Sequence, residues 1–158
     1  RLLELARQAL DAGQNRLPEL RWGDGCLRVW NGWVVSVTEP ASDWVLPGEV
    51  VVGEPAEGNW GRLDWEPAED GTGLPSGARL SCSTSGEIES LTPLNRPQKS
   101  TNKWLQEMRI PPWWRPHLYV LCSEKGPVWI LPVGPLSAAV ALDSHIETPG
   151  FRPVWRPP

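Results

Sequence analysis

The strongest candidates for binding chemistry are the cations of residues 91–116, which we call the basic segment. Five cations stand there against one acid, Glu107, for a net charge of +4: they are Arg96, Lys99, Lys103, Arg109 and Arg115. The preceding stretch, 41–90, holds ten acids and two arginines, a net charge of −8. A basic island in a chain of net charge −4 can attract an anionic partner. The open alternative is a surface helix whose lysines are simply solvated.

The acids of the preceding stretch are weaker candidates for chemistry. Glu66, Glu69 and Asp70 lie in a predicted loop, and clustered acids can bind a metal ion or act in general acid–base catalysis. Their spacing fits no calcium-binding loop, and no histidine lies nearby in the sequence to complete a transition-metal site. His117 and His145 stand alone, and the sequence has neither a phosphate-binding Gly-rich loop with Lys nor a Gly-x-Ser-x-Gly motif. We therefore predict no catalytic residue, no metal site and no cofactor within this sequence.

A short helix is predicted over residues 100–109, in the middle of the basic segment. Ser100 or Thr101 can cap its N-terminus, because a hydroxyl oxygen accepts one of the unpaired backbone N–H groups. A helical wheel separates a polar face from an apolar one, with Lys99, Lys103 and Gln106 on the first and Trp104, Leu105 and Met108 on the second. This pattern is typical of an amphipathic helix.

A rigid corner is predicted directly after this helix. Pro111 and Pro112 cannot continue a helix, and a residue before proline is pushed toward extended backbone, so the helix is expected to end near Arg109. Trp113 and Trp114 follow the rigid turn that the two prolines form, and Arg115 is next to them in the sequence.

The rest of the sequence predicts a small β-rich fold. Eighteen prolines and fifteen glycines favour short elements and many turns, and eleven tryptophans, against one Phe and one Tyr, are expected to form much of the core. A helix is predicted at 1–13. Strands are predicted at 20–22, 27–30, 33–38, 50–52, 62–65, 80–83, 118–122, 128–133, 138–142 and 151–155, with hairpin turns at 31–32 and 123–127. The predicted class is α+β: a small mixed or antiparallel, barrel-like sheet with one or two short helices, the 100–109 helix at its edge.

Length and cysteine usage suggest how the chain is organised. At 158 residues it fits one small domain and the tail of another, with a seam in the polar stretch 39–42, and its start at Arg1 suggests a segment of a longer protein. Cys26, Cys82 and Cys122 are odd in number and widely spaced, which favours free thiols in a cytosolic protein over disulfides or a zinc site. No apolar run approaches the roughly 20 residues of a membrane span, and no signal peptide opens the sequence.

The stretch KSTNKWLQEMRIPPWWRP resembles a signature near the C-terminus of the tRNA(Ile)-lysidine synthetase family. In that signature a basic helix ending in Gln-Glu runs into Ile-Pro-Pro-Trp-x-Arg, which Gln106, Glu107, residues 110–113 and Arg115 match. Weaker likeness extends to LLELARQAL, to LRWGDGCLRVWNGWVVSV and to residues 59–63. The resemblance covers nearly the whole chain, and only the central motif is specific.

The resemblance implies a role in tRNA recognition. The family consists of ATP-dependent ligases that attach lysine to the wobble cytidine of a minor isoleucine tRNA in the cytoplasm, with ATP and Mg²⁺ bound by an N-terminal catalytic domain. Residues 1–40 then resemble the helical and β-hairpin tail of a substrate-binding domain, and 41–158 a C-terminal tRNA-binding domain that is not active by itself. The implied partners are tRNA(Ile) and the enzyme's own N-terminal domain; a homodimer is left open. The implied tRNA-binding residues are Arg96, Lys99, Lys103, Arg109, Trp113, Trp114 and Arg115.

Departures from the family pattern keep other functions open. Where the family tends to have Arg-x-Gly-Gly-Glu, residues 83–87 read Ser-Thr-Ser-Gly-Glu; Asn102 replaces one lysine of a usual pair, and Lys99 stands in for an arginine. These losses favour one alternative, a structural or dimerisation module whose RNA contacts have eroded. The other alternative is a tryptophan-rich carbohydrate-binding module, against which the cations argue.

Overall fold

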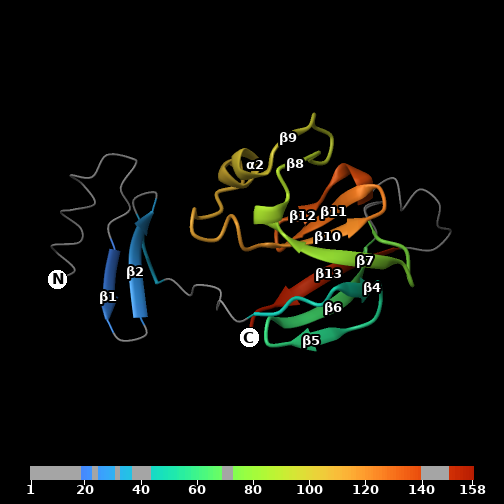
Figure 1. The fold of residues 1–158 in the computed structure, drawn as a ribbon, viewed down its shortest axis with the longest axis horizontal. Coiled ribbons are helices and arrows are strands. Elements are labelled where there is room, and N and C mark those ends of the chain that lie inside the picture. The colour runs from blue at the N-terminus through green and yellow to red at the C-terminus, as the bar shows by residue number, and fades with distance from the viewer. Residues whose placement is uncertain (1–18, 23–24, 31–32, 37–43, 69–72, 140–149) are drawn as a thin grey trace. The chain divides into compact units, whose positions relative to one another are not determined.

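The computed structural model describes residues 19–22, 25–30, 33–36, 44–68, 73–139 and 150–158. The chain divides into two compact units, Arg1–Pro40 and Ala41–Pro158. The first unit holds a three-stranded antiparallel sheet of β1 (Glu19–Trp22), β2 (Gly25–Trp30) and β3 (Trp33–Ser36), in that order (Figure 1). These strands confirm the ones predicted there. The helix predicted at 1–13 and the seam predicted at 39–42 lie outside the described residues.

Two antiparallel sheets and a short strand pair build the second unit. The five-stranded sheet has the order β12-β11-β10-β7-β4, the three-stranded sheet has the order β13-β6-β5, and β8 pairs with β9. The bounds are β4 (Glu49–Val51), β5 (Ala56–Gly58), β6 (Gly61–Ala68), β7 (Arg79–Thr84), the 3-10 helix η1 (Ser85–Glu87), β8 (Ser90–Leu91), β9 (Lys99–Ser100), α2 (Thr101–Glu107), β10 (Tyr119–Ser123), β11 (Gly126–Leu131), β12 (Gly134–Pro135) and β13 (Gly150–Arg156).

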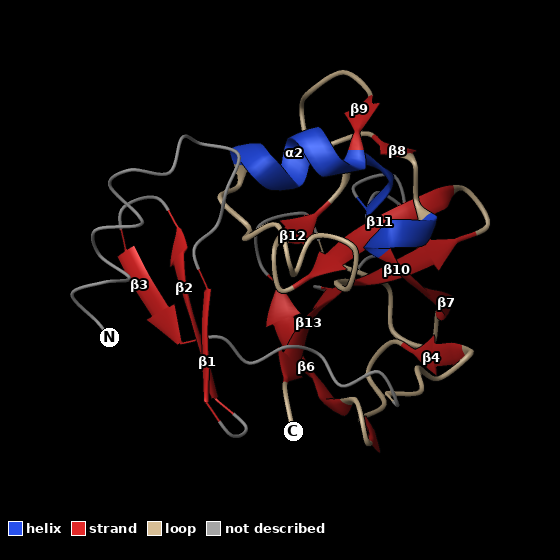
Figure 2. Ribbon diagram, turned by 60° about the vertical axis from the view of Figure 1, so that its left-hand side comes forward, coloured by secondary structure: helices blue, strands red, loops and turns tan. Residues whose placement is uncertain are grey.

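The five-stranded sheet lies between two cores. Successive side chains of a strand point to opposite faces, so Leu121 of β10 packs with Leu63 of the three-stranded sheet. Val120, next to it, packs with Trp104 and Leu105 of α2. The unit therefore has three layers: α2 with β8 and β9, the five-stranded sheet, and the three-stranded sheet (Figures 1 and 2). The expectation that the 100–109 helix lies at the sheet edge is wrong, because its apolar residues cover a face.

The α+β class is confirmed, but the described residues form no closed barrel. The end strands of the five-stranded sheet, β12 and β4, have two and three residues, and they do not pair with each other. Very short edge strands limit pairing beyond the sheet. The predicted strand at 138–142 is also wrong: residues 137–139 are helical, and 140–142 lie outside the described residues.

Tryptophan does form much of the core, as predicted. Trp60, Trp104 and Trp129 are buried. Tyr119 stacks edge-on with Trp155 at a ring-centroid distance of 5.0 Å, a geometry that aromatic pairs favour. Every tryptophan whose side chain the structure describes is buried or half-buried: Trp44, Trp60, Trp65, Trp104, Trp113, Trp114, Trp129 and Trp155. A module that stacks sugars on exposed indole rings is therefore disfavoured.

Candidate nucleic-acid interface

Helix α2 carries the middle of the basic segment. The Ser100 hydroxyl accepts the backbone N–H of Lys103 at 3.4 Å, which confirms that a hydroxyl caps the helix. Trp104 and Leu105 are buried on the sheet side, as the helical wheel predicted. Met108, predicted on the same apolar face, is 47% exposed because the regular helix ends one residue before it.

The helix ends in a Schellman motif ahead of the two prolines. The N–H of Arg109 donates to Gln106 O at 3.0 Å, and that of Ile110 donates to Leu105 O at 2.9 Å. These two bonds define the motif, whose residue after the cap is usually a left-handed glycine. Here that residue is Arg109, with φ of 60°. A left-handed arginine is strained, and this one is also exposed to solvent.

The corner that follows α2 is held by two residues of η1. The Ser85 hydroxyl donates to Arg115 O and accepts the N–H of Leu118 at 3.0 Å. Gly86 N–H donates to Pro116 O at 3.0 Å, and a Cβ on Gly86 would lie 2.9 Å from that oxygen, so a side chain does not fit there without a shift. These contacts of η1 fix the backbone at Arg115 and Pro116.

Two of the five predicted cations share one carboxylate inside the segment. Lys99 Nζ lies 2.9 Å and 2.8 Å from the two carboxylate oxygens of Glu107, and Arg96 Nη1 lies 3.5 Å from Oε2 of the same group. The hydrogen bond from Lys99 is the main reason that the pKa of Glu107 is lowered. Sequence reasoning missed Glu107 as a counter-ion, because Lys99 precedes the helix and eight residues separate the pair.

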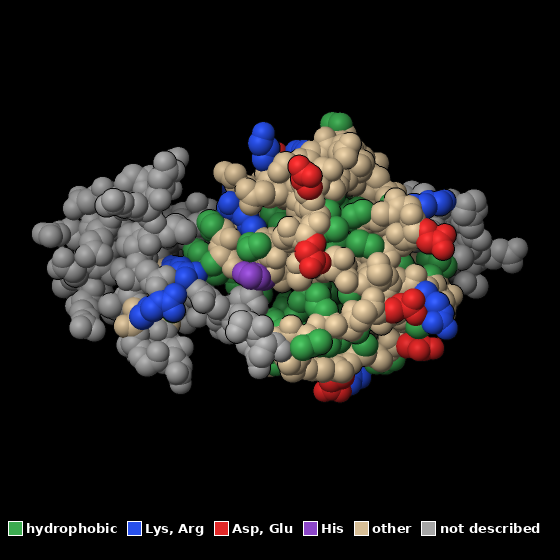
Figure 3. Space-filling model, viewed as in Figure 1, with side chains coloured by type: hydrophobic (Ala, Val, Ile, Leu, Met, Phe, Trp, Pro, Cys, Tyr) green, Lys and Arg blue, Asp and Glu red, His purple; other side chains and the backbone are tan. Residues whose placement is uncertain are grey.

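The other three cations are available to a ligand in different degrees. Lys103 and Arg109 are exposed, and within the described part of the chain neither forms an ion pair. Arg115 is half-buried, with Nε donating to Ile110 O at 2.8 Å, and burial lowers the pKa of its guanidinium. In Figure 3, blue side chains lie over the region of α2 and β9 with a red one beside them, and red and blue side chains are also mixed around β4 and β7.

The two adjacent tryptophans of the corner offer little open ring surface. Trp113 and Trp114 are both half-buried, and Trp114 packs against the core beneath α2. This contact gives Trp114 a structural role. The structure thus brings the predicted site residues together on α2, its flanks and the corner, but assigns them unequal exposure.

An open hollow lies beside the first turn of α2 and was not predicted. It has a volume of about 340 Å³ and is lined by residues 85–86, 88–89, 100–102 and 115–116. Thr101 is one of the lining residues, and its hydroxyl is buried and has no hydrogen-bond partner in the described structure. The sequence signals for this hollow are the Ser85–Gly86 pair and Thr101, and they carry no recognisable spacing because 15 residues separate them.

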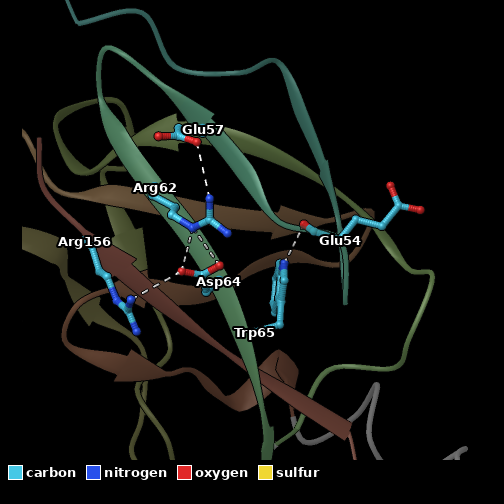
Figure 4. A network of polar contacts seen from close by, with 6 residues as sticks. All are labelled: Glu54, Glu57, Arg62, Asp64, Trp65 and Arg156. Atoms are coloured by element: carbon cyan, nitrogen blue, oxygen red, sulfur yellow. Dashed lines mark hydrogen bonds and ion pairs between the residues drawn. The ribbon is translucent and has the colours of Figure 1, made fainter.

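The acidic side of the second unit differs from the basic segment in how its charges are matched. Figure 4 shows Arg62 between Glu57, at 3.3 Å, and Asp64, at 2.9 Å, with Arg156 at 3.9 Å from Asp64. The hydrogen bond from Arg62 is the main reason that the pKa of Asp64 is lowered. The Trp65 indole N–H in the same view donates to Glu54 O at 2.9 Å. These arginines are already engaged with carboxylates.

Other chemistries have little support in the described residues. Glu66, predicted in a loop, lies in β6 and pairs with Arg152 at 2.9 Å, because the strand continues to Ala68; Glu69 and Asp70 lie outside the described residues. No group of three or more His, Cys, Asp or Glu that could hold a metal ion occurs in the described part of the chain. His117 is exposed, and His145 lies outside it. No helix among the described residues is long and apolar enough to cross a membrane.

Comparison with known families supports the sequence resemblance. Residues 82–144 match the family model described as the TilS substrate C-terminal domain, the C-terminal region of tRNA(Ile)-lysidine synthetase. The matched range runs from β7 through η1, the basic segment, the corner and the β10–β11 hairpin to beyond the described helix at 137–139. No curated protein matches the chain at a significant level.

Proposed function

We propose that this chain is the tRNA-recognition part of a tRNA(Ile)-lysidine synthetase. On this proposal, residues 41–158 bind tRNA(Ile) and 1–40 are the tail of the substrate-binding domain. The ATP- and Mg²⁺-dependent ligation belongs to the N-terminal catalytic domain of such a cytoplasmic enzyme. The family match over 82–144 supports the assignment of the region, and the basic segment supports the choice of ligand.

One observation carries the choice of RNA as the ligand. Lys103 and Arg109 are exposed and have no carboxylate partners in the described residues. Lys103 lies in the first turn of α2 and Arg109 just beyond its last residue, while Arg115 lies in the adjoining corner. Phosphate contacts of this kind position RNA without reading its sequence. Helical RNA is recognised mainly through shape, phosphates and 2′-hydroxyls, which a small charged platform can contact.

The charge distribution also supports a defined orientation of the RNA. Residues 41–90 carry a net charge of −8, so phosphates are repelled from that part of the chain and attracted to the +4 basic segment. Within the segment, Glu107 already engages Lys99 and Arg96. We therefore assign the main contacts to Lys103, Arg109 and Arg115, and a smaller share to the two cations that Glu107 holds.

The test is a salt titration of tRNA(Ile) binding with the full 158-residue chain. A triple variant replaces Lys103, Arg109 and Arg115 with Gln. Its matched control replaces Arg79, Lys125 and Arg152 with Gln, which changes the net charge equally at exposed positions outside the basic segment. Each lost phosphate contact is expected to reduce the slope of log affinity against log salt by roughly 0.7–0.9, so the triple variant should lose about two to three units.

The outcomes separate the proposal from its alternative. A slope that changes in the triple variant and stays near the parent value in the control supports the basic segment as the RNA platform. Equal slopes in the two variants indicate a general charge effect. Unaltered binding in both variants contradicts the assignment of the basic segment as the RNA-binding surface. In that case the structural alternative takes over, which the engagement of Lys99 and Arg96 by Glu107 already favours in part.

A further inference from the structure

The hollow beside α2 is not accounted for by phosphate contacts on the exposed face of the helix. Its walls come from η1, the first turn of α2 and the corner, and its volume is about 340 Å³. This falls at the low end of the range of roughly 300–1,000 Å³ typical of small-ligand sites. A hollow of this size can receive one nucleotide, whereas an RNA helix cannot enter it.

Arg115 is the cationic residue that lines the hollow. Its Nε is held by Ile110 O at 2.8 Å, so the guanidinium has a fixed position. No carboxylate pairs with it in the described residues, and burial lowers its pKa. A half-buried guanidinium without a counter-ion favours an anion, and its planar donor array suits phosphate oxygens.

A second wall residue also lacks a partner. Thr101 is 3% exposed, and its Oγ1 forms no hydrogen bond in the described structure. Buried polar groups are nearly always satisfied, so an orphan hydroxyl calls for an explanation. Thr101 lines the hollow, and a threonine in a helix populates two χ1 rotamers, so a group bound in the hollow is a candidate partner for this hydroxyl.

The remaining walls suit a nucleotide better than a bare anion. Glu89 lines the hollow, and a carboxylate there opposes an isolated phosphate but accepts hydrogen bonds from ribose hydroxyls or base amino groups. Asn102 adds an amide that can donate and accept. Ile88 and Pro116 supply an apolar surface for a sugar or a base.

We propose that this hollow binds a single unpaired ribonucleotide of the RNA, with its phosphate on Arg115 and its sugar or base between Glu89, Asn102 and the apolar wall. This inference rests on the proposed function and narrows it: the RNA must present a nucleotide outside its helical stem, at an end or in a bulge. Lys103 and Arg109 then hold the stem, while the hollow holds the unpaired nucleotide.

The experiment compares two RNA hairpins with the same stem, one blunt and one with a four-nucleotide 3′ single strand. Binding to the 158-residue chain is measured by fluorescence anisotropy. The single strand is expected to tighten binding about fivefold, on the scale of one added hydrogen bond. The Thr101→Val/Asn102→Ala variant, which retains Arg115, should lose most of this gain and keep its affinity for the blunt hairpin, whereas Lys103→Gln should weaken both hairpins equally. Thr92→Val, at an exposed threonine outside the hollow, is the matched control.

The result that overturns the inference is equal binding of the two hairpins, or a single-strand gain that survives Thr101→Val/Asn102→Ala. If neither hairpin binds, the proposed function fails, and adenosine 5′-monophosphate then tests the hollow separately. Its addition should shift the amide NMR signals of Gly86 and Asn102 in the parent more than inorganic phosphate does. If these signals do not move at millimolar nucleotide, the inference about the hollow is refuted independently of the proposed function.

Discussion

Replacing Arg109 with glycine should make the protein more stable and weaken its binding to RNA. Arg109 occupies the left-handed position of the Schellman motif, with φ of 60°. That backbone costs a non-glycine residue about 1–2 kcal/mol, and glycine loses roughly 0.5–1 kcal/mol more conformational entropy than other residues on folding. The difference predicts a gain of about 0.5–1 kcal/mol in the free energy of unfolding for Arg109→Gly.

The assay is urea unfolding followed by tryptophan fluorescence, together with RNA affinity across a salt titration. The midpoint should rise without a change in the m-value, since the exposed surface of the unfolded chain is the same. RNA affinity should fall, and the salt slope should lose about one unit because one cation is removed. A stabilising change that impairs binding is the pattern expected when strain is retained for a ligand contact.

Two controls from the same chain separate strain from charge. Arg109→Gln removes the cation but keeps a residue with a side chain in the left-handed backbone, so the stability of this variant should stay within about 0.5 kcal/mol of the parent while the salt slope still falls. Among the described residues, Asn95 is the other non-glycine residue of positive φ, at 59°, and Asn95→Gly should add less stability because asparagine tolerates this backbone. The reasoning is refuted if Arg109→Gly lowers the free energy of unfolding. It is also refuted if Arg109→Gln raises the free energy of unfolding as much as Arg109→Gly does.

Three further predictions follow from individual contacts. Gly86→Ala should lower the free energy of unfolding by about 1–3 kcal/mol in urea, because a Cβ meets Pro116 O, whereas Gly48→Ala, with open space around it, should stay within about 0.5 kcal/mol. Glu107→Gln should tighten RNA binding at low salt, because it releases Lys99. The pKa of Glu107 is lowered in the folded protein, so its ion pair stabilises the fold above about pH 4.5 and this stabilisation is lost as the pH falls. The urea midpoint of the variant should therefore decline less in acid than that of the parent. Burial raises the pKa of Tyr119, the single tyrosine, to about 12. In an ultraviolet titration the phenol of the folded protein should therefore ionise at a higher pH than that of an unfolded sample, which ionises near pH 10. The free energy of unfolding should fall as the pH rises from about 10 to about 12, because the folded state retains the proton.

The elements with local sequence signals were predicted correctly. The helix was expected over 100–109 and spans Thr101–Glu107, because its cap, its apolar spacing and the following prolines all lie within a few residues. The hairpin around 123–127 was predicted for the same reason, and β10 and β11 form it. By contrast, residues 138–142 read as an apolar strand, although 138–139 are helical. A short apolar run cannot by itself distinguish a strand from a buried helical turn.

The predicted contact residues could be chosen from the sequence, but their pairing could not. Lys99 and Arg96 meet Glu107 only because β9 and the preceding loop fold back beside α2. Ser85 reaches Leu118 across 33 residues, so no local pattern connects them. Long-range contacts of this kind depend on the sheet that brings the segments together, and a sequence without its fold does not display them.

Among the described residues of the second unit, the arginines outside the basic segment differ from Arg109 and Arg115 inside it in whether they pair with carboxylates. Outside the basic segment, its four arginines, Arg62, Arg79, Arg152 and Arg156, each meet a carboxylate within 4 Å. Inside the segment, the chain leaves Arg115 half-buried without a counter-ion, Arg109 in strained backbone and the Thr101 hydroxyl unpaired, as far as the described residues extend. Proteins retain such local costs mostly where a function requires them. These three costs lie on α2 and its flanks, where we propose that an anionic ligand binds, and this clustering is the reason that we favour a binding surface over a solvated helix.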